Sequence, residues 1–150
     1  EPSNLNRQQY FIDQIGLPKV IALQENLRRI NPGVEVVAHH QRVTADNLTA
    51  LFADVDILVE AFDAAEQKAL LTSNFLSKIA KKPLVAASGM AGFEPSNSIR
   101  TEKISDRLYL CGDGMTAAQP GRGLMAPRVG IAAHHQANAV LRLLLGEEPG

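Results

Sequence analysis

The chain is poor in cysteine, in net charge and in long apolar runs, and each shortage excludes a class of protein. Cys111 is the only cysteine, which excludes an intrachain disulfide and a zinc site built from cysteines alone, so we expect a cytoplasmic protein. Fifteen basic residues stand against sixteen acidic ones, for a formal charge of −1. The basic residues are also scattered, so we expect neither nucleic acid nor a membrane as a partner. Apolar runs such as 140–145 are far too short to span a bilayer.

Apolar spacing along the remaining sequence predicts alternating helices and strands. A content of 45% apolar residues in a chain of 150 is enough for one substantial core. Helical spacing predicts helices over 17–30, 45–54, 64–81 and 127–145. Short apolar segments predict strands over 34–37, 56–62 and 83–88, and a hairpin over 98–104 and 108–111.

The run Ile57-Leu58-Val59 is typical of a strand that is covered on both faces, as in a parallel sheet. We therefore predict an α/β fold of the Rossmann-like type, with a doubly wound, mostly parallel sheet and an antiparallel hairpin at one edge.

The opening segment Ser3-Asn4-Leu5-Asn6-Arg7-Gln8 has the composition of a polyphosphate-binding loop. Arg7 offers a planar fork for phosphate oxygens, and Lys19 would add a point charge at the start of a helix. Asp63 follows the predicted strand 56–62, at the sheet edge where open α/β folds bind ligands, and a carboxylate there is well placed to hold magnesium. Such a set suits phosphoryl or nucleotidyl transfer.

Each of these residues also has a purely structural interpretation. Arg7 could cap a helix or lie in solvent, as most loop arginines do. Asp63 could be the N-cap of the helix that follows it, because a carboxylate there accepts free backbone N–H groups. Lys19 is less easily explained in this way, since a cation in the first turn opposes the helix dipole.

The same residues resemble a known family. The segment 3–8, followed by Gly16 and Lys19, resembles the nucleotide site of the ThiF/MoeB adenylating family, which also includes the ubiquitin-activating enzymes. The segment 123–137 is similar to that family's Pro-x-Val-Gly and Gln-Ala helix. Together with 87–92 and 109–114, it makes the chain most similar to short ThiF-like proteins of the thiamin pathway.

The resemblance implies an adenylyltransferase that uses ATP and magnesium to activate the carboxyl-terminal glycine of a small ubiquitin-like sulfur carrier protein. By this resemblance, Asn4, Arg7, Gln8 and Lys19 would bind ATP, Asp63 would hold the metal, and Arg7, Lys19 and Asp63 would be catalytic. It also implies a homodimer. Three positions depart from the family pattern. Ala64 replaces an asparagine, and Glu60 and Phe62 differ from the Asp-Cys-Thr-like residues that usually precede the aspartate.

In this family the opening segment follows the second strand of the fold. We therefore expect a strand, a helix, a strand and a glycine-rich phosphate loop upstream, and we interpret residues 1–150 as the carboxyl-terminal part of a single ThiF-type adenylating domain. Without those elements we expect the segment to be inactive.

Cysteine and histidine counts limit other chemistry. Larger family members carry two Cys-x-x-Cys zinc pairs and many have a reactive cysteine in a crossover loop, so with Cys111 alone we expect no zinc. Cys111 ends a predicted strand, which favours a packed thiol over a nucleophile. The pairs His39-His40 and His134-His135 would each point in two directions, which favours structural roles.

Three alternatives remain open. The glycine-rich loop 112–123 is either a flexible surface connection or the place where, by the family resemblance, the tail of the sulfur carrier protein passes over the nucleotide. The whole protein could be a nicotinamide-dependent oxidoreductase, because the same fold serves both functions, although no hydride-transfer acid or base is apparent and the segment 4–7 would then have no use. It could also be a non-catalytic family member that only docks the carrier.

Overall fold

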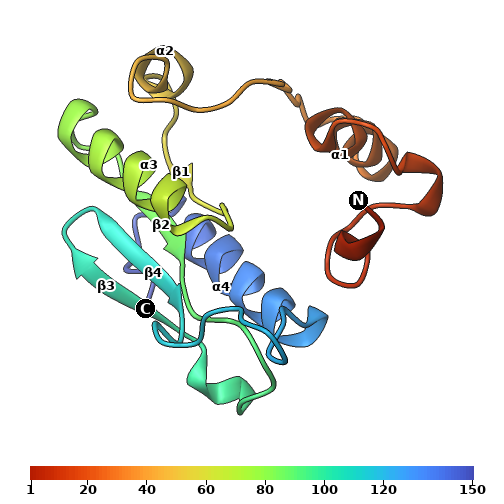
Figure 1. Cartoon of the computed structure of the whole chain (residues 1–150). Helices are drawn as coiled ribbons and strands as arrows, with labels where there is room; N and C mark the ends of the chain where they lie inside the picture. Colours follow the sequence, from red (N-terminus) through yellow and green to blue (C-terminus); the bar gives the residue numbers. More distant parts are fainter. The chain divides into compact units, whose positions relative to one another are not determined.

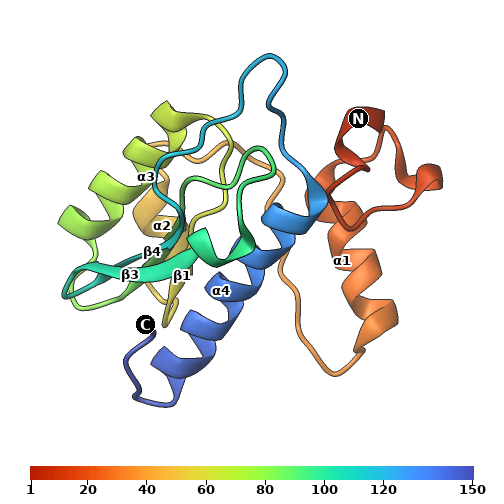
Figure 2. The same cartoon turned by 90° about the horizontal axis from the view of Figure 1, so that it is seen from below.

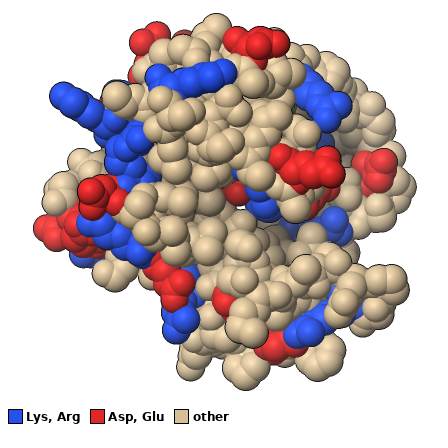
Figure 3. Space-filling model, turned by 60° about the vertical axis from the view of Figure 1, so that its left-hand side comes forward, with Lys and Arg blue, Asp and Glu red and all other residues tan.

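The computed structural model describes residues 1–150, and they form two compact units, 1–42 and 43–150 (Figure 1). None of the helices combines the length and apolar character that crossing a bilayer requires. On the face shown in Figure 3, lysine and arginine side chains are interspersed with acidic ones rather than gathered into one basic field.

The first unit consists of two short 3-10 helices, η1 (Pro2–Asn4) and η2 (Ile12–Gln14), and one α-helix, α1 (Lys19–Ile30). Two buried amides join η2 to α1. Gln14 Nε2 donates to Asn26 Oδ1 at 2.7 Å, and Asn26 Nδ2 donates back to Gln14 Oε1 at 3.1 Å. Because buried amides must find partners, this reciprocal pair fixes how η2 lies against α1.

The predicted strand over 34–37 is wrong, because this segment is irregular. The first unit contains no sheet, so the segment has no ladder to join. Val34 and Val37 are 50% and 68% exposed, and the Val36 carbonyl accepts a hydrogen bond from Gln24 Nε2 at 2.7 Å instead of from a strand. β-propensity describes a fit to a pleated, half-buried surface, and the valines alone do not create that surface.

The second unit contains one four-stranded sheet and three α-helices. Its elements in chain order are α2 (Leu48–Phe52), β1 (Leu58–Val59), α3 (Ala65–Lys78), β2 (Leu84–Ala87), η3 (Ser96–Ser98), β3 (Arg100–Ser105), β4 (Leu108–Gly112) and α4 (Ala126–Leu144). The strand order is β1-β2-β4-β3. β1, β2 and β4 are parallel, while β3 pairs antiparallel with β4 at the edge. The predicted mostly parallel sheet with an edge hairpin is confirmed.

Helices cover both faces of this sheet (Figure 2). On one face, Leu58 and Leu84 pack with α2 and α3 in a cluster centred on Phe75. On the other face, Val85 and Tyr109 pack against α4. Strand β2 lies between β1 and β4 and is buried along its whole length. This is the doubly wound arrangement that the alternating pattern predicts.

The expectation that 57–59 is covered on both faces is wrong for Val59, which is 44% exposed, whereas Leu58 is buried. β1 is an edge strand, and α4 packs mainly over β2, β3 and β4. The sheet face beside α4 therefore stays partly open at β1. An apolar run indicates a strand without showing that helices cover it from both sides.

Candidate functional site

Three of the predicted nucleotide-binding residues line one hollow in the first unit. Asn4, Gln8 and Lys19 contribute to its wall, together with residues of η2 and α1. The hollow measures about 20 Å³, which is room for about one water molecule. These residues therefore gather around one point, but the first unit alone does not form a nucleotide pocket.

The Arg7 head group is held by the opening segment itself. Its Nη1 donates to the Ser3 carbonyl at 3.1 Å and to Asn6 Oδ1 at 2.9 Å, while Nη2 and Nε donate to no protein atom. An arginine fixed at one nitrogen still presents donors for a phosphate. Arg7 does not line the hollow beside Asn4 and Gln8.

Gln8 and Lys19 each have an unused polar group. Gln8 Oε1 is buried without a hydrogen-bond partner, which is a costly state unless a water or ligand donates to it. Lys19 is the first residue of α1 and is exposed, with no acidic residue in that first turn. An unpaired cation beside the free N–H groups of a helix start favours an anion there.

Asp63 lies in the second unit, in the turn between β1 and α3, at the carboxyl end of β1. Its side chain is exposed and makes no hydrogen bond or ion pair within the chain. The N-cap residue of α3 is Ala64, and no side chain caps that helix. The alternative interpretation of Asp63 as an N-cap is therefore wrong.

An open carboxylate of this kind fits magnesium held jointly with a nucleotide. Mg²⁺ is usually bound through one or two carboxylates plus substrate phosphates and waters rather than by an all-protein cage. Asp63 is unengaged, and no group of three or more His, Cys, Asp or Glu side chains gathers in the chain. The residues present fit a metal that arrives with phosphate oxygens.

An ion pair that the sequence analysis did not identify joins Glu60, which precedes Asp63 by three residues, to Lys68 of α3, whose side chain is 26% exposed. Glu60 is 1% exposed, and both of its carboxylate oxygens lie 3.0 Å from Lys68 Nζ of α3. Only the spacing of eight residues between a strand end and a helix hints at this pair. Glu60 stood out in the sequence solely as a departure from the family pattern.

The base of the loop 112–123 is held by an ion pair in which both side chains are buried. Arg128 of α4 donates from Nη2 to Asp113 Oδ2 at 2.5 Å, and the two side chains are 4% and 9% exposed. Burial raises the pKa of Asp113, but hydrogen bonds from Thr116 and Met115 and the charge of Arg128 outweigh it, so that the pKa lies below its usual value. Asp113 is therefore held in its charged form.

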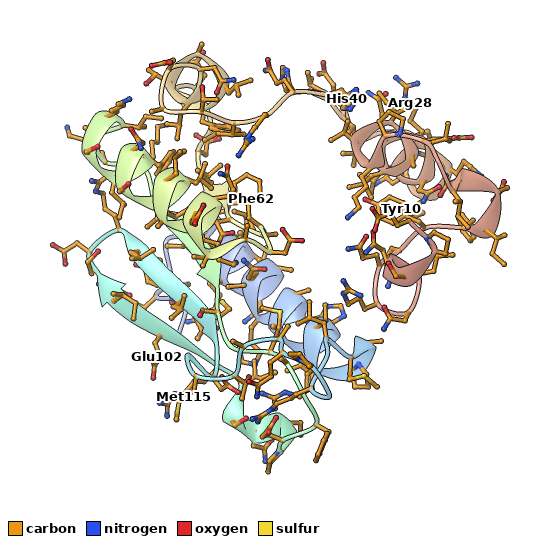
Figure 4. All side chains as sticks on the ribbon, viewed as in Figure 1. Tyr10, Arg28, His40, Phe62, Glu102 and Met115 are labelled. Carbon is orange, nitrogen blue, oxygen red and sulfur yellow. The ribbon has the colours of Figure 1, made fainter.

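The loop borders an open hollow of about 480 Å³ within the second unit, where Met115 is 88% exposed (Figure 4). Glu94, which also lines this hollow, forms an ion pair with Arg122 of the loop. Gly92 also donates its N–H to the Gly123 carbonyl at 2.9 Å. Both ends of the loop are thus fastened, while its middle is exposed.

Cys111 is a packed thiol, as predicted. It is fully buried on β4, and burial raises the pKa of the thiol, only partly opposed by a contact with Thr101 Oγ1. His135 Nδ1 lies 3.0 Å from the same hydroxyl, whereas His134 is exposed. The two adjacent histidines therefore diverge, and His39 and His40 are both exposed.

A comparison with protein-family models decides the family, because the model described as the ThiF family matches residues 1–150. The chain belongs to the ThiF family. This ThiF-family chain is 30% identical, over 155 aligned residues, to the sulfur carrier protein ThiS adenylyltransferase of Bacillus subtilis, an alignment covering 99% of the chain and 45% of that protein. It is 27% identical over 151 residues to the molybdopterin-synthase adenylyltransferase of Escherichia coli, covering 96% of the chain and 59% of that protein.

Solved structures agree on the fold. The tRNA N6-threonylcarbamoyladenosine dehydratase TcdA of E. coli, solved in complex with ATP, matches with a TM-score of 0.75 and 21% identity. The match covers 95% of this ThiF-family chain and 72% of that one. The chain spans about half the length of the two curated relatives above, and identity at this level to TcdA establishes the architecture alone.

Proposed function

We propose that the protein containing this chain is an ATP- and magnesium-dependent adenylyltransferase that activates the carboxyl-terminal glycine of a ubiquitin-like sulfur carrier protein. The observation that supports it most strongly is that Asn4, Gln8 and Lys19 line one hollow of a ThiF-family chain, while Arg7 of the same opening segment keeps free donors for a phosphate. Two relatives named as adenylyltransferases, one of the sulfur carrier protein ThiS and one of molybdopterin synthase, also support this activity.

In the proposed reaction, a carboxylate oxygen of the carrier attacks the α-phosphorus of ATP. A phosphorus–oxygen bond forms to the carrier, the bond between the α-phosphorus and the bridging oxygen breaks, and pyrophosphate leaves. Arg7 and Lys19 would stabilise the negative charge that develops on the phosphate oxygens. Asp63 would hold Mg²⁺, which supplies further charge neutralisation when bound.

We propose thiamin biosynthesis as the pathway, in the cytoplasm, with a homodimer as the working form. The support for the pathway is the 30% identity to the ThiS adenylyltransferase. The molybdopterin-synthase adenylyltransferase is similar to this chain to a comparable degree. The experiment must therefore compare different carrier proteins. Purified carriers of the two kinds, each with an intact glycine tail, should support different rates of ATP–pyrophosphate exchange.

Substitution of Arg7 tests the proposed site. Arg7→Ala in the intact protein should lower carrier-dependent pyrophosphate exchange about a hundredfold, because one lost charge-assisted contact to a transition state costs about 3 kcal/mol. Arg28→Ala is the matched control, since Arg28 is an exposed arginine on α1 of the same unit (Figure 4).

The outcomes separate the competing functions. Near-normal exchange in Arg7→Ala would refute the assigned site. Carrier binding without any exchange in the wild-type protein would favour a non-catalytic docking module. Tight binding of a nicotinamide nucleotide, with no exchange, would favour the oxidoreductase.

A further inference from the structure

Glu60 is a buried carboxylate that the proposed reaction does not use. It directly follows β1, and at 1% exposure it is the most deeply buried acidic residue of the chain. Burying a carboxylate is costly unless it is paired and hydrogen-bonded. Glu60 meets both conditions, because its Oε1 accepts from the backbone N–H of Phe62 at 2.6 Å and both oxygens accept from Lys68 Nζ.

The pair is also anchored to two other parts of the sheet. Lys68 Nζ donates to the carbonyl of Ala87, the last residue of β2, at 2.9 Å. From the opposite face, Gln136 Nε2 of α4 donates to the Glu60 backbone carbonyl at 2.9 Å. Glu60 is therefore fixed through α3, through α4 and through its own turn.

This arrangement determines the direction in which the chain leaves β1. A carboxylate that accepts from the N–H two residues later holds the intervening backbone in one conformation, here called the turn 60–62. Phe62 is the residue that this turn fixes (Figure 4), and Asp63 is the next residue along the chain. Asp63 itself has no hydrogen bond or ion pair that would orient it, so its position depends on the backbone of the preceding residues.

We propose that the Glu60–Lys68 pair is the positioning element of the metal-binding carboxylate: it fixes the turn 60–62 so that Asp63 points to a divalent cation carried by the nucleotide phosphates. The inference rests on the proposed function, and neither Glu60 nor Lys68 touches the substrate. A role in stability alone would not require this pair, because apolar side chains of similar volume often replace a buried ion pair without loss of stability.

The replacement of an ion pair by apolar side chains of similar volume gives the variant that tests this proposal. Glu60→Leu combined with Lys68→Met should keep the core filled and the melting temperature close to that of the wild type, while removing the acceptor that holds the Phe62 N–H. Mn²⁺ serves as the probe, titrated by electron paramagnetic resonance into the intact protein with a non-hydrolysable ATP analogue. The double variant should bind Mn²⁺ about tenfold more weakly, as is usual when outer partners of a ligand are lost.

Two further variants complete the test. Asp63→Asn should weaken Mn²⁺ binding by a similar factor, and adding it to the double variant should cause little further loss, because both act on one ligand. Lys103→Met is the matched control, since Lys103 forms a lysine–glutamate pair with Glu148 at the surface. It should leave Mn²⁺ binding unchanged.

Wild-type Mn²⁺ affinity in the folded double variant, with weakened affinity in Asp63→Asn, would overturn the positioning role and leave the proposed function standing. Unchanged affinity in Asp63→Asn would instead overturn the metal role of Asp63 itself. If the double variant does not fold, Glu60→Leu alone decides, because it removes the acceptor for the Phe62 N–H while Lys68, whose side chain is 26% exposed, can still reach water. A several-fold loss of Mn²⁺ affinity then supports the proposal, and unchanged affinity overturns it.

Discussion

Removing the Arg128 guanidinium should destabilise the second unit strongly. In Arg128→Met, the Asp113 carboxylate would stay buried without its charged partner, and the carbonyls of Glu94 and Pro95 would lose donors that now lie at 2.9 and 3.1 Å. Breaking a buried pair from one side costs about 3–5 kcal/mol. We expect about 3 kcal/mol, the lower end of that range, because Asp113 keeps its hydrogen bonds from Met115 and Thr116.

For a unit of about 100 residues, each kcal/mol lowers the melting temperature by about 4 °C, so the expected shift is about 12 °C. Thermal unfolding followed by circular dichroism measures it. Adding Asp113→Asn should recover part of the loss, because the remaining side chain is no longer an unpaired charge. The matched control is Arg100→Met, which removes an exposed pair with Glu102 and should cost less than about 1 kcal/mol. A melting temperature for Arg128→Met within a few degrees of wild type would refute the reasoning.

Three other changes have expected outcomes. Gly112→Ala should prevent correct folding, seen as loss of soluble protein, because Gly112 has a φ of 145° and a Cβ there would overlap the Ser88 carbonyl oxygen. Cys111→Ala should retain pyrophosphate exchange, and wild-type Cys111 should react with a thiol reagent only after unfolding, whereas a covalent carrier adduct on Cys111 would contradict both statements. The pKa of Asp113 is lower in the folded protein than its usual value of 3.8. The charged Asp113 carboxylate therefore stabilises the fold fully above pH 3.8, and this stabilisation is lost as the pH falls through the lowered pKa. Asp113→Asn should flatten this acid-side fall in stability, and an identical pH profile in the variant would show that another carboxylate causes it.

The sequence predicts those features of the fold that local patterns determine. Apolar spacing is enough for α1 and for the hairpin of β3 and β4, whose observed bounds differ from the predicted ones by a few residues. The predicted strand over 34–37 is wrong because a strand needs a neighbouring strand, which its own sequence does not encode. The same limit applies to Arg107, whose guanidinium donates to the carbonyls of Leu76 and Ile79 at the end of α3, a contact across about thirty residues.

For the site, residue types and the family resemblance indicate which side chains to consider, and the structure adds how each is held. Asn4, Gln8 and Lys19 line one hollow of the first unit, and their binding of ATP stays a prediction. The pairing of Glu60 with Lys68 could not be predicted, because the register of a strand end against a helix depends on packing rather than on spacing. Magnesium binding at Asp63 stays a prediction.

The order in which the sheet is built affects how the protein must fold during synthesis. β2 and β4 pair in the interior of the sheet, yet α4, which covers their second face, follows both strands in the chain. At about 5–20 residues per second, the ribosome needs a second or more to add the residues from β4 to the end of α4. During that interval Val85 and Tyr109 have no cover on that face. Nascent chains that have emerged as far as β4 but not yet as far as α4 should therefore depend on chaperone binding or on proximity to the ribosome to avoid aggregation.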